Sequence, residues 1–114
     1  MAKSQISLCF IFFFLYLVSG NFIMVNAQKT WCVAKPSSDQ AALLENINYA
    51  CSQVDCRIIS RGCPCFSPDN LVSHASVAMN LYYHAKGRNQ WNCYFNNSGL
   101  IVLTDPSYGS CTYE

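Results

Sequence analysis

The sequence predicts a small α+β domain stapled by disulfides, with two main helices and a short antiparallel β-hairpin. Three observations predict this fold class. Eight cysteines occur in 114 residues, and all but Cys9 follow residue 27. Two segments repeat apolar residues with helical periodicity, and two short apolar runs flank a turn-rich tetrapeptide. A domain of this size buries too little apolar surface to be stable without cross-links, which the cysteines supply.

Residues 1–27 have the pattern of a secretory signal peptide. Lys3 lies in a short n-region, residues 6–18 are apolar, and Val25-Asn26-Ala27 is a small-residue cleavage site. Polar residues from Ser19 onward interrupt the apolar stretch short of the ~20 residues that a spanning helix needs. We therefore expect cleavage after Ala27, a domain over residues 28–114, and no transmembrane segment in the mature chain.

The charge balance excludes several classes of partner. Removing Lys3 with the signal peptide leaves six of the seven basic side chains against six acidic ones, so the mature chain is formally neutral. A neutral chain with no basic stripe does not collect phosphates, which argues against nucleic acid and anionic membranes as partners. We expect an uncharged partner.

The first helix is expected over residues 39–51. Ser37 and Gln40 have the spacing of a capping box just before it. Its core stripe is expected to contain Leu44, Ile47 and Cys51, with Leu43 and Ala50 beside it. Its water-facing positions are expected to be Glu45, Asn46 and Asn48.

The second helix is expected to follow Ser67-Pro68-Asp69-Asn70 and to run to Lys86, with Gly87 as its stop. Four cysteines, Cys51, Cys56, Cys63 and Cys65, make the segment before it a cross-linked loop. The core stripe of this helix is expected to contain Leu71, Ala75, Ala78, Tyr82 and Ala85, whereas Asn80 points the opposite way.

Residues 93–95 and 100–104 are expected to form the two strands of the hairpin, joined through residues 96–99. Alternation places Phe95 inward with Cys93 and leaves Tyr94 and Asn96 on the outer face. Asn96-Asn97-Ser98 is also a glycosylation sequon, so Asn96 is expected to carry a glycan.

Catalysis and metal binding are not expected. A glycosidase needs two carboxylates about 5–9.5 Å apart across one bond, and each acid here has a simpler place in a helix turn, a loop or a solvated face. The sequence contains no phosphate-binding loop or nucleophile motif, so no catalytic residue and no cofactor is assigned. Cys63-Pro64-Cys65 lacks further zinc ligands, because His74 and His84 are ten residues apart on one helix and point in different directions.

Eight groups of residues carry a family resemblance: Trp31-Cys32-Val33-Ala34-Lys35-Pro36, Tyr49-Ala50-Cys51, Asp55-Cys56, Pro64-Cys65-Phe66, His74-Ala75-Ser76, Asn80 with Tyr82-Tyr83, Cys93-Tyr94-Phe95 and Asp105-Pro106-Ser107-Tyr108-Gly109-Ser110-Cys111. In this order and spacing, the chain resembles the plant X8 domain, carbohydrate-binding module family 43. The resemblance implies a secreted, non-catalytic module that binds β-1,3-glucan, the polymer of callose, in the apoplast or cell wall. Only three residues follow Cys111, so a GPI anchor signal is not expected.

The resemblance also implies a disulfide pairing. Six cysteines alone allow 15 pairings, and the family arrangement joins Cys32 to Cys93, Cys51 to Cys56 and Cys65 to Cys111. Cys63 stands where the family usually has glycine and is the odd thiol. We expect a monomer, with a disulfide-linked dimer through Cys63 as the alternative.

Neutral polysaccharides are bound by aromatic rings laid against sugar rings, with polar side chains bonding the hydroxyls. The candidates for this sugar face are Tyr83, Trp91, Tyr94 and Tyr108, with Asn80, Asp105 and His74 as hydrogen-bonding groups. The aromatics assigned to the core are Trp31, Phe66, Tyr82 and Phe95. His74 has the simpler role of tying its helix to a neighbouring loop.

Two alternative functions remain. A small cysteine-rich secreted protein can bind or transfer lipids, although the adjacent Cys-Cys pair and the four bridges of lipid-transfer proteins are missing here. A secreted signalling or defence protein is the other alternative. Glucan binding and lipid binding can be separated by comparing the binding of insoluble β-1,3-glucan with the uptake of a fluorescent fatty acid.

Overall fold

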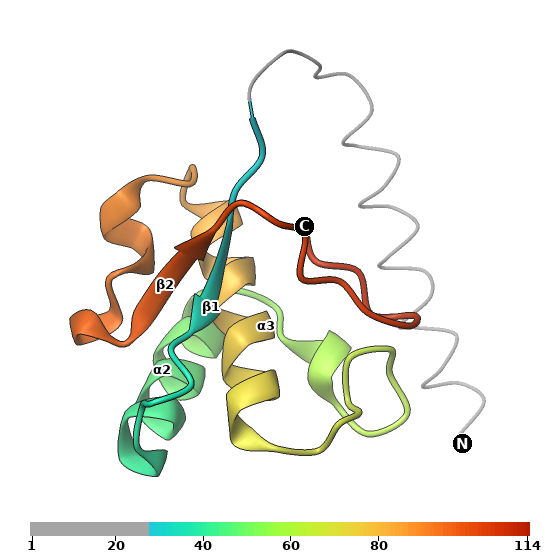
Figure 1. Ribbon diagram of the computed structural model, residues 1–114. Helices are drawn as coiled ribbons and strands as arrows, with labels where there is room; N and C mark the ends of the chain where they lie inside the picture. Colours follow the sequence, from blue (N-terminus) through green and yellow to red (C-terminus); the bar gives the residue numbers. More distant parts are fainter. Residues whose placement is uncertain (1–27) are drawn as a thin grey trace.

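The computed structural model describes residues 28–114, and the expected signal peptide with its cleavage site lies outside them. The elements, in chain order, are β1 (Trp31–Ala34), α2 (Gln40–Gln53), η1 (Arg57–Ile59), α3 (Leu71–Ala85), η2 (Gln90–Cys93), η3 (Phe95–Asn97) and β2 (Gly99–Val102), where η denotes a 3₁₀ helix. Two main helices, an antiparallel two-stranded sheet and three disulfides confirm the predicted α+β class (Figure 1). Within residues 28–114, none of the helices has the length and apolar character needed to cross a membrane.

The two strands are not the predicted hairpin. β2 pairs antiparallel with β1, with Trp31 opposite Val102 and Ala34 opposite Gly99 (Figure 1). Residues 93–97 are not extended, because η2 and η3 occupy them and three consecutive residues, 95–97, have positive φ. This left-handed stretch reverses the chain just before β2, so β2 reaches the N-terminal strand instead of folding back on residues 93–95.

Helix α3 closes the other edge of β1. The backbone N–H of Cys32 donates to Asn80 Oδ1 and that of Ala34 donates to Ser76 Oγ, both at 2.9 Å. Ser76 and Asn80 are four residues apart and so lie on one face of α3. Buried backbone N–H groups require partners, and these two side chains supply them where a third strand would otherwise pair. Asn80 is therefore buried, and its predicted outward orientation is wrong.

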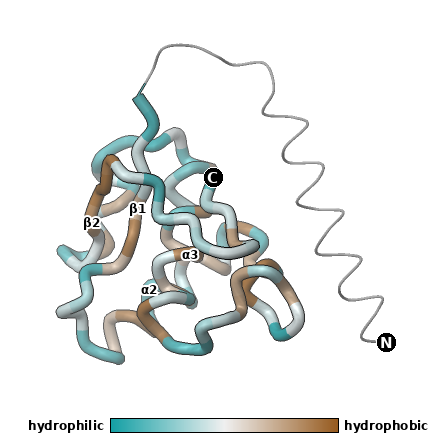
Figure 2. The backbone as a smooth tube through the Cα atoms, turned by 45° about the vertical axis from the view of Figure 1, so that its right-hand side comes forward, coloured by the Kyte–Doolittle hydropathy of each residue, from teal (hydrophilic) through white to brown (hydrophobic). Residues whose placement is uncertain are grey.

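The core consists of two clusters on either side of this edge. Cys32 and Ala34 of β1 pack into a cluster formed by Leu43, Ala75, Met79, Tyr83 and Cys93. Trp31 packs into the second cluster, with Cys65, Val77, Cys111 and Tyr113. Successive β1 side chains thus enter different clusters, as strand alternation requires. The tube in Figure 2 is hydrophobic along β2, the strand that completes this sheet.

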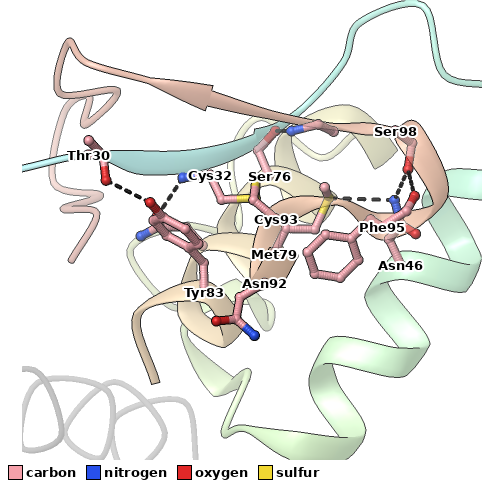
Figure 3. Close-up of a disulfide and its surroundings, with 12 residues drawn as sticks. Thr30, Cys32, Asn46, Ser76, Met79, Tyr83, Asn92, Cys93, Phe95 and Ser98 are labelled. Atoms are coloured by element: carbon pink, nitrogen blue, oxygen red, sulfur yellow. Dashed lines mark hydrogen bonds between the residues drawn. A yellow bond between two sulfur atoms is a disulfide. The ribbon is translucent and has the colours of Figure 1, made fainter. Parts of the chain in front are cut away.

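Helix α2 buries a different face from the one predicted. Leu43, Asn46 and Ala50 are buried, whereas Leu44 is exposed, so the buried stripe is displaced by about one residue. Asn46 causes the displacement, because its Nδ2 donates to Ser98 Oγ at 2.8 Å and approaches Met79 Sδ at 3.6 Å (Figure 3). The helix is capped by Asp39, whose carboxylate accepts from the N–H of Ala42, and not by the predicted Ser37–Gln40 box.

Helix α3 starts and ends close to the predicted positions. Its N-cap is Asn70, whose side chain accepts from the N–H of Ser73 at 2.8 Å, so the helix begins after Pro68 and not at it. It ends at Ala85, and Gly87 follows with φ of 103°, the conformation that makes glycine a stop signal.

The three described disulfides join Cys32 to Cys93, Cys51 to Cys56 and Cys65 to Cys111. These are the pairs that the family resemblance implies. Cys63 lies outside these three pairs, and the expectation that it is an odd thiol stays a prediction.

Candidate functional site

Two exposed aromatic side chains project from η2 and its C-cap. Trp91 is 73% exposed and Tyr94 is 60% exposed. They are three residues apart, and a 3₁₀ helix has three residues per turn, so both rings emerge on the same side of this turn, about 6 Å apart along its axis. Tyr94 has helical φ and ψ, which continues the turn as far as the second ring. We call these two rings the η2 platform.

A disulfide and two hydrogen bonds hold the backbone of the platform. Cys93 is buried and bonded to Cys32 of β1, which fixes η2 to the sheet (Figure 3). Asn89 and Asn92 close the start of the turn, since the N–H of Asn92 donates to the carbonyl of Asn89 at 2.8 Å and the N–H of Asn89 donates to Asn92 Oδ1 at 3.3 Å. The backbone under the two rings is therefore held in place without burying them.

The carbonyl of Tyr94 also fixes the platform to β2. It accepts from the N–H of Gly99 at 3.2 Å. A Cβ atom on Gly99 would collide with the carbonyl of Cys93, so glycine is required for this close approach.

A second aromatic group, which we call the tyrosine cluster, comprises Tyr49, Tyr82 and Phe95. Tyr49 and Tyr82 meet edge to face with ring centroids 5.4 Å apart, and their hydroxyl oxygens are 3.3 Å apart. Phe95 also packs against Tyr82, at 5.6 Å between ring centroids, and Lys86 Nζ lies 5.6 Å from the Tyr82 ring centre. The hydrogen bond with Tyr49 raises the pKa of Tyr82, so the phenol of Tyr82 is neutral at ordinary pH. Tyr49 is half exposed, and the predicted core position of Tyr82 is wrong, because its ring is only partly buried.

Tyr83 and Asn80 do not belong to an exposed sugar face. Tyr83 is 2% exposed, packs in the core and shares a hydrogen bond of 2.7 Å with the hydroxyl of Thr30 (Figure 3). Asn80 is buried against β1, where its Oδ1 accepts a hydrogen bond from the N–H of Cys32. Both predictions assumed that one stripe of α3 faces the core, whereas β1 and η2 each cover a further part of this helix.

Tyr108 and Asp105 lie in the C-terminal turn, apart from the core. Tyr108 is 37% exposed, and its hydroxyl donates to the carbonyl of Ser67 at 2.9 Å. Asp105 Oδ1 accepts from the backbone N–H and the hydroxyl of Ser107, and these bonds lower the pKa of Asp105. The turn thereby occupies one oxygen of this carboxylate. His74 Nε2 lies 2.6 Å from the carbonyl of Phe66, which ties α3 to the preceding loop as expected.

Three further carboxylates also have local structural partners. Asp39 caps α2. Asp55 forms an ion pair with Arg57 at 2.9 Å, and the hydrogen bond from Arg57 lowers the pKa of Asp55. Asp69 lies 4.0 Å from His74. Asp39 and Asp69 precede α2 and α3 instead of lying in their first turns, so the first-turn positions expected for these two acids are wrong.

Sequence reasoning missed the tyrosine cluster. Tyr49 stands beside Ala50 and Cys51 in a segment used only for the family resemblance, and Tyr82 was assigned to the core. One signal is present in the sequence: Tyr49 lies three residues after Asn46 and therefore near the face of α2 that is buried. This signal could not be used, because the burial of the polar Asn46 cannot be inferred from periodicity.

Comparison with known proteins identifies one family and several relatives. The model of the X8 domain matches residues 30–100. A glucan endo-1,3-beta-D-glucosidase from Olea europaea is 47% identical over 88 residues, which are 76% of this chain and 19% of that protein. A glucan endo-1,3-beta-glucosidase from Triticum aestivum is 49% identical over 83 residues, 73% of this chain and 18% of that protein. The chain thus spans about a fifth of these two proteins. The major pollen allergen Ole e 10 from Olea europaea is 46% identical over 87 residues, 75% of this chain and 71% of that protein.

Proposed function

The chain belongs to the X8 domain family, a carbohydrate-binding module of glucan-related proteins, and from this membership we propose that it binds linear β-1,3-glucan without hydrolysing it. The proposed contact surface is the η2 platform of Trp91 and Tyr94. Tyr108 is not part of this surface, because its hydroxyl bonds Ser67 and Ser73 at the N-terminal end of α3, whereas η2 follows the C-terminal end of that helix.

One observation carries this proposal: two large aromatic rings are exposed together on a turn that is covalently fixed to the sheet. Exposed aromatic pairs are uncommon in small soluble domains unless they contact a partner. The faces of sugar rings are apolar enough to pack on aromatic rings, and no charge is needed for this contact. Because the backbone beneath the rings is already fixed, binding requires little ordering of the main chain.

The match to the glucosidases covers only the X8 part of those proteins, which supports binding and not catalysis in this chain. The four acids with local partners, Asp39, Asp55, Asp69 and Asp105, serve caps, turns and an ion pair. We propose no catalytic residue and no cofactor.

The proposal includes a location. Cleavage after Ala27 would release residues 28–114 into the apoplast or cell wall, where β-1,3-glucan occurs, and Asn96 is exposed, as an N-glycan acceptor must be. Mass spectrometry of the secreted protein before and after treatment with a glycan-releasing amidase tests both the new N-terminus and the glycan.

Co-sedimentation with insoluble β-1,3-glucan tests the binding proposal. The folded domain should pellet with this polymer and remain in solution with cellulose, with a Kd on the order of micromolar to millimolar, as expected for a shallow surface. Trp91→Ala and Tyr94→Ala should each weaken binding by ~1 kcal/mol or more. Leu103→Ala is the matched control, since Leu103 is 63% exposed and lies outside the platform.

Failure of the folded protein to pellet with β-1,3-glucan would contradict the binding proposal. Release of reducing sugar from a soluble β-1,3-glucan by the pure domain would contradict the absence of catalysis. Uptake of a fluorescent fatty acid without glucan binding would favour the lipid alternative.

A further inference from the structure

We propose that Tyr49 and Tyr82 form an oxidative cross-linking site, at which a one-electron oxidant joins the two rings into a dityrosine that covalently links α2 to α3. The inference does not depend on glucan binding. It follows from the geometry of the tyrosine cluster and from the chemistry of phenoxyl radicals.

The two rings are already in contact. Their centroids are 5.4 Å apart with planes inclined by 61°, and their hydroxyl oxygens are 3.3 Å apart. Each ortho carbon is bonded to the carbon that carries the hydroxyl. Hydroxyl oxygens 3.3 Å apart therefore place the ortho carbons, which must form the new bond, near one another, and reorientation of the rings completes their approach.

The contact is held on both sides. Tyr49 is on α2, two residues before Cys51, whose bridge to Cys56 fixes the C-terminal end of the helix. Tyr82 is on α3, where Phe95 and Lys86 both approach its ring. Neither phenol needs a large backbone movement to reach the other, so radical coupling within the molecule has a high effective concentration.

The reaction balances with hydrogen peroxide as the oxidant and a heme peroxidase as the catalyst. Each phenol loses one electron and one proton and becomes a phenoxyl radical. The radicals couple between ortho carbons, and the two ortho hydrogens return to the phenol oxygens. The pair has then lost two electrons and two protons, which reduce one hydrogen peroxide to two waters.

Access favours this pair over the other described tyrosines. Tyr49 is 50% exposed, so an external oxidant can reach it, and the hydrogen bond offers a direct route to Tyr82. Tyr83 and Tyr113 are buried. Tyr94 and Tyr108 are exposed, but within residues 28–114 neither has a ring contact with another tyrosine of the kind that joins Tyr49 to Tyr82.

A bond between these rings would add a cross-link at the C-terminal half of both main helices, a region in which the short Cys51–Cys56 bridge lies within α2 and the following loop. The oxidised monomer should therefore resist unfolding more than the untreated protein.

The experiment treats the dilute, disulfide-intact protein with a heme peroxidase and hydrogen peroxide. The monomer is then isolated, its dityrosine fluorescence is recorded, and its peptides are mapped after reduction. We expect a monomer lighter by two hydrogen atoms, a cross-linked peptide pair that contains Tyr49 and Tyr82, and a higher midpoint of thermal unfolding.

The controls use substitutions that keep the rings packed. Tyr49→Phe and Tyr82→Phe should each abolish the intramolecular cross-link, and circular dichroism before oxidation verifies their fold. Tyr94→Phe should form the cross-link as the parent does. The proposal is overturned if the parent monomer gives no such peptide under conditions that convert free tyrosine to dityrosine, if Tyr49→Phe gives the same yield, or if the coupling maps only to dimers joined through Tyr94.

Discussion

Buried polar side chains on two helices determine how this small domain is assembled. Asn80 and Ser76 bond the open edge of β1, and Asn46 connects α2 to Ser98 just before β2. Each of these side chains satisfies a buried group that water cannot reach. Removing one partner leaves the other unsatisfied, which costs more than the bond itself contributes.

Asn80→Ala should lower the free energy of unfolding by about 1–3 kcal/mol, because the N–H of Cys32 would then be buried without an acceptor. Denaturant unfolding with the disulfides intact measures the change. Asn48→Ala, an exposed position on α2, is the control and should have little effect. The folded Asn80→Ala protein should still bind glucan, and a specific loss of binding without a loss of stability would return Asn80 to the sugar site.

Burial of Tyr113 should make the domain less stable at alkaline pH. Burial raises the pKa of its phenol above the ordinary value of about 10. Above that pH the unfolded chain releases a proton that the native state retains, so native stability is intact below about pH 10 and falls as the pH rises. Tyr113→Phe should reduce this fall in short thermal melts across the range, whereas Tyr94→Phe should not. If the melting temperature of Tyr113→Phe fell with rising pH as steeply as that of the parent, burial of Tyr113 would not be the cause of the alkaline loss of stability.

At the level of elements, α3 is the central one, with β1, η2 and α2 packed around it. Its neighbouring stripes serve different partners: Ala75 and Met79 face one core cluster, Ser76 and Asn80 face β1, and Val77 faces the other cluster. A helix covered on several sides carries little amphipathic signal, which is why its outward face was misassigned.

Gly99→Ala tests how closely η2 is joined to β2. The added methyl would collide with the carbonyl of Cys93, so we expect a loss of about 1–3 kcal/mol in unfolding free energy from overpacking. Relieving this collision requires the backbone at Cys93 to move. This movement should displace the neighbouring platform and weaken glucan binding in the protein that remains folded. Leu100→Ala is the neighbouring control, since Leu100 is 42% exposed. Equal stability of Gly99→Ala and the parent would contradict the close approach.

The sequence could predict those features that depend on local pattern. Both helices, the stop at Gly87 and the exposure of Trp91 follow from periodicity and turn residues. Tyr94 was expected outside for the wrong reason, as an outward strand residue, whereas a 3₁₀ turn places it there. The pairing of β2 with β1, the burial of Asn46 and the Tyr49–Tyr82 contact depend on segments far apart in the chain, which no local pattern encodes.

At the level of the whole molecule, the disulfides connect distant segments of a small core. Cys32–Cys93 and Cys65–Cys111 span 61 and 46 residues, whereas Cys51–Cys56 spans five. The first long bridge lies in one core cluster and the second lies in the other. Each of the two core clusters therefore contains one long-range disulfide.

Replacing both cysteines of one bridge with serine should give losses that follow loop length. In the chain-entropy model each long bridge contributes about 4 kcal/mol and the short one about 2 kcal/mol. Denaturant unfolding of the three double variants should therefore rank Cys51–Cys56 as the least costly bridge to remove. If removal of the short bridge were the most damaging change, local strain and not chain entropy would control stability.

The central claim, that sugar packs on the η2 platform, is tested most directly by tryptophan fluorescence. The sequence has two tryptophans; Trp31 is 6% exposed and Trp91 is 73% exposed, so a neutral collisional quencher reports mainly on Trp91. Titration with a linear β-1,3-glucan oligomer should shift the emission to shorter wavelength and protect it from the quencher, whereas a β-1,4-linked oligomer should not. Unchanged emission and quenching under conditions in which the protein has bound β-1,3-glucan would contradict the account and place the sugar on another face.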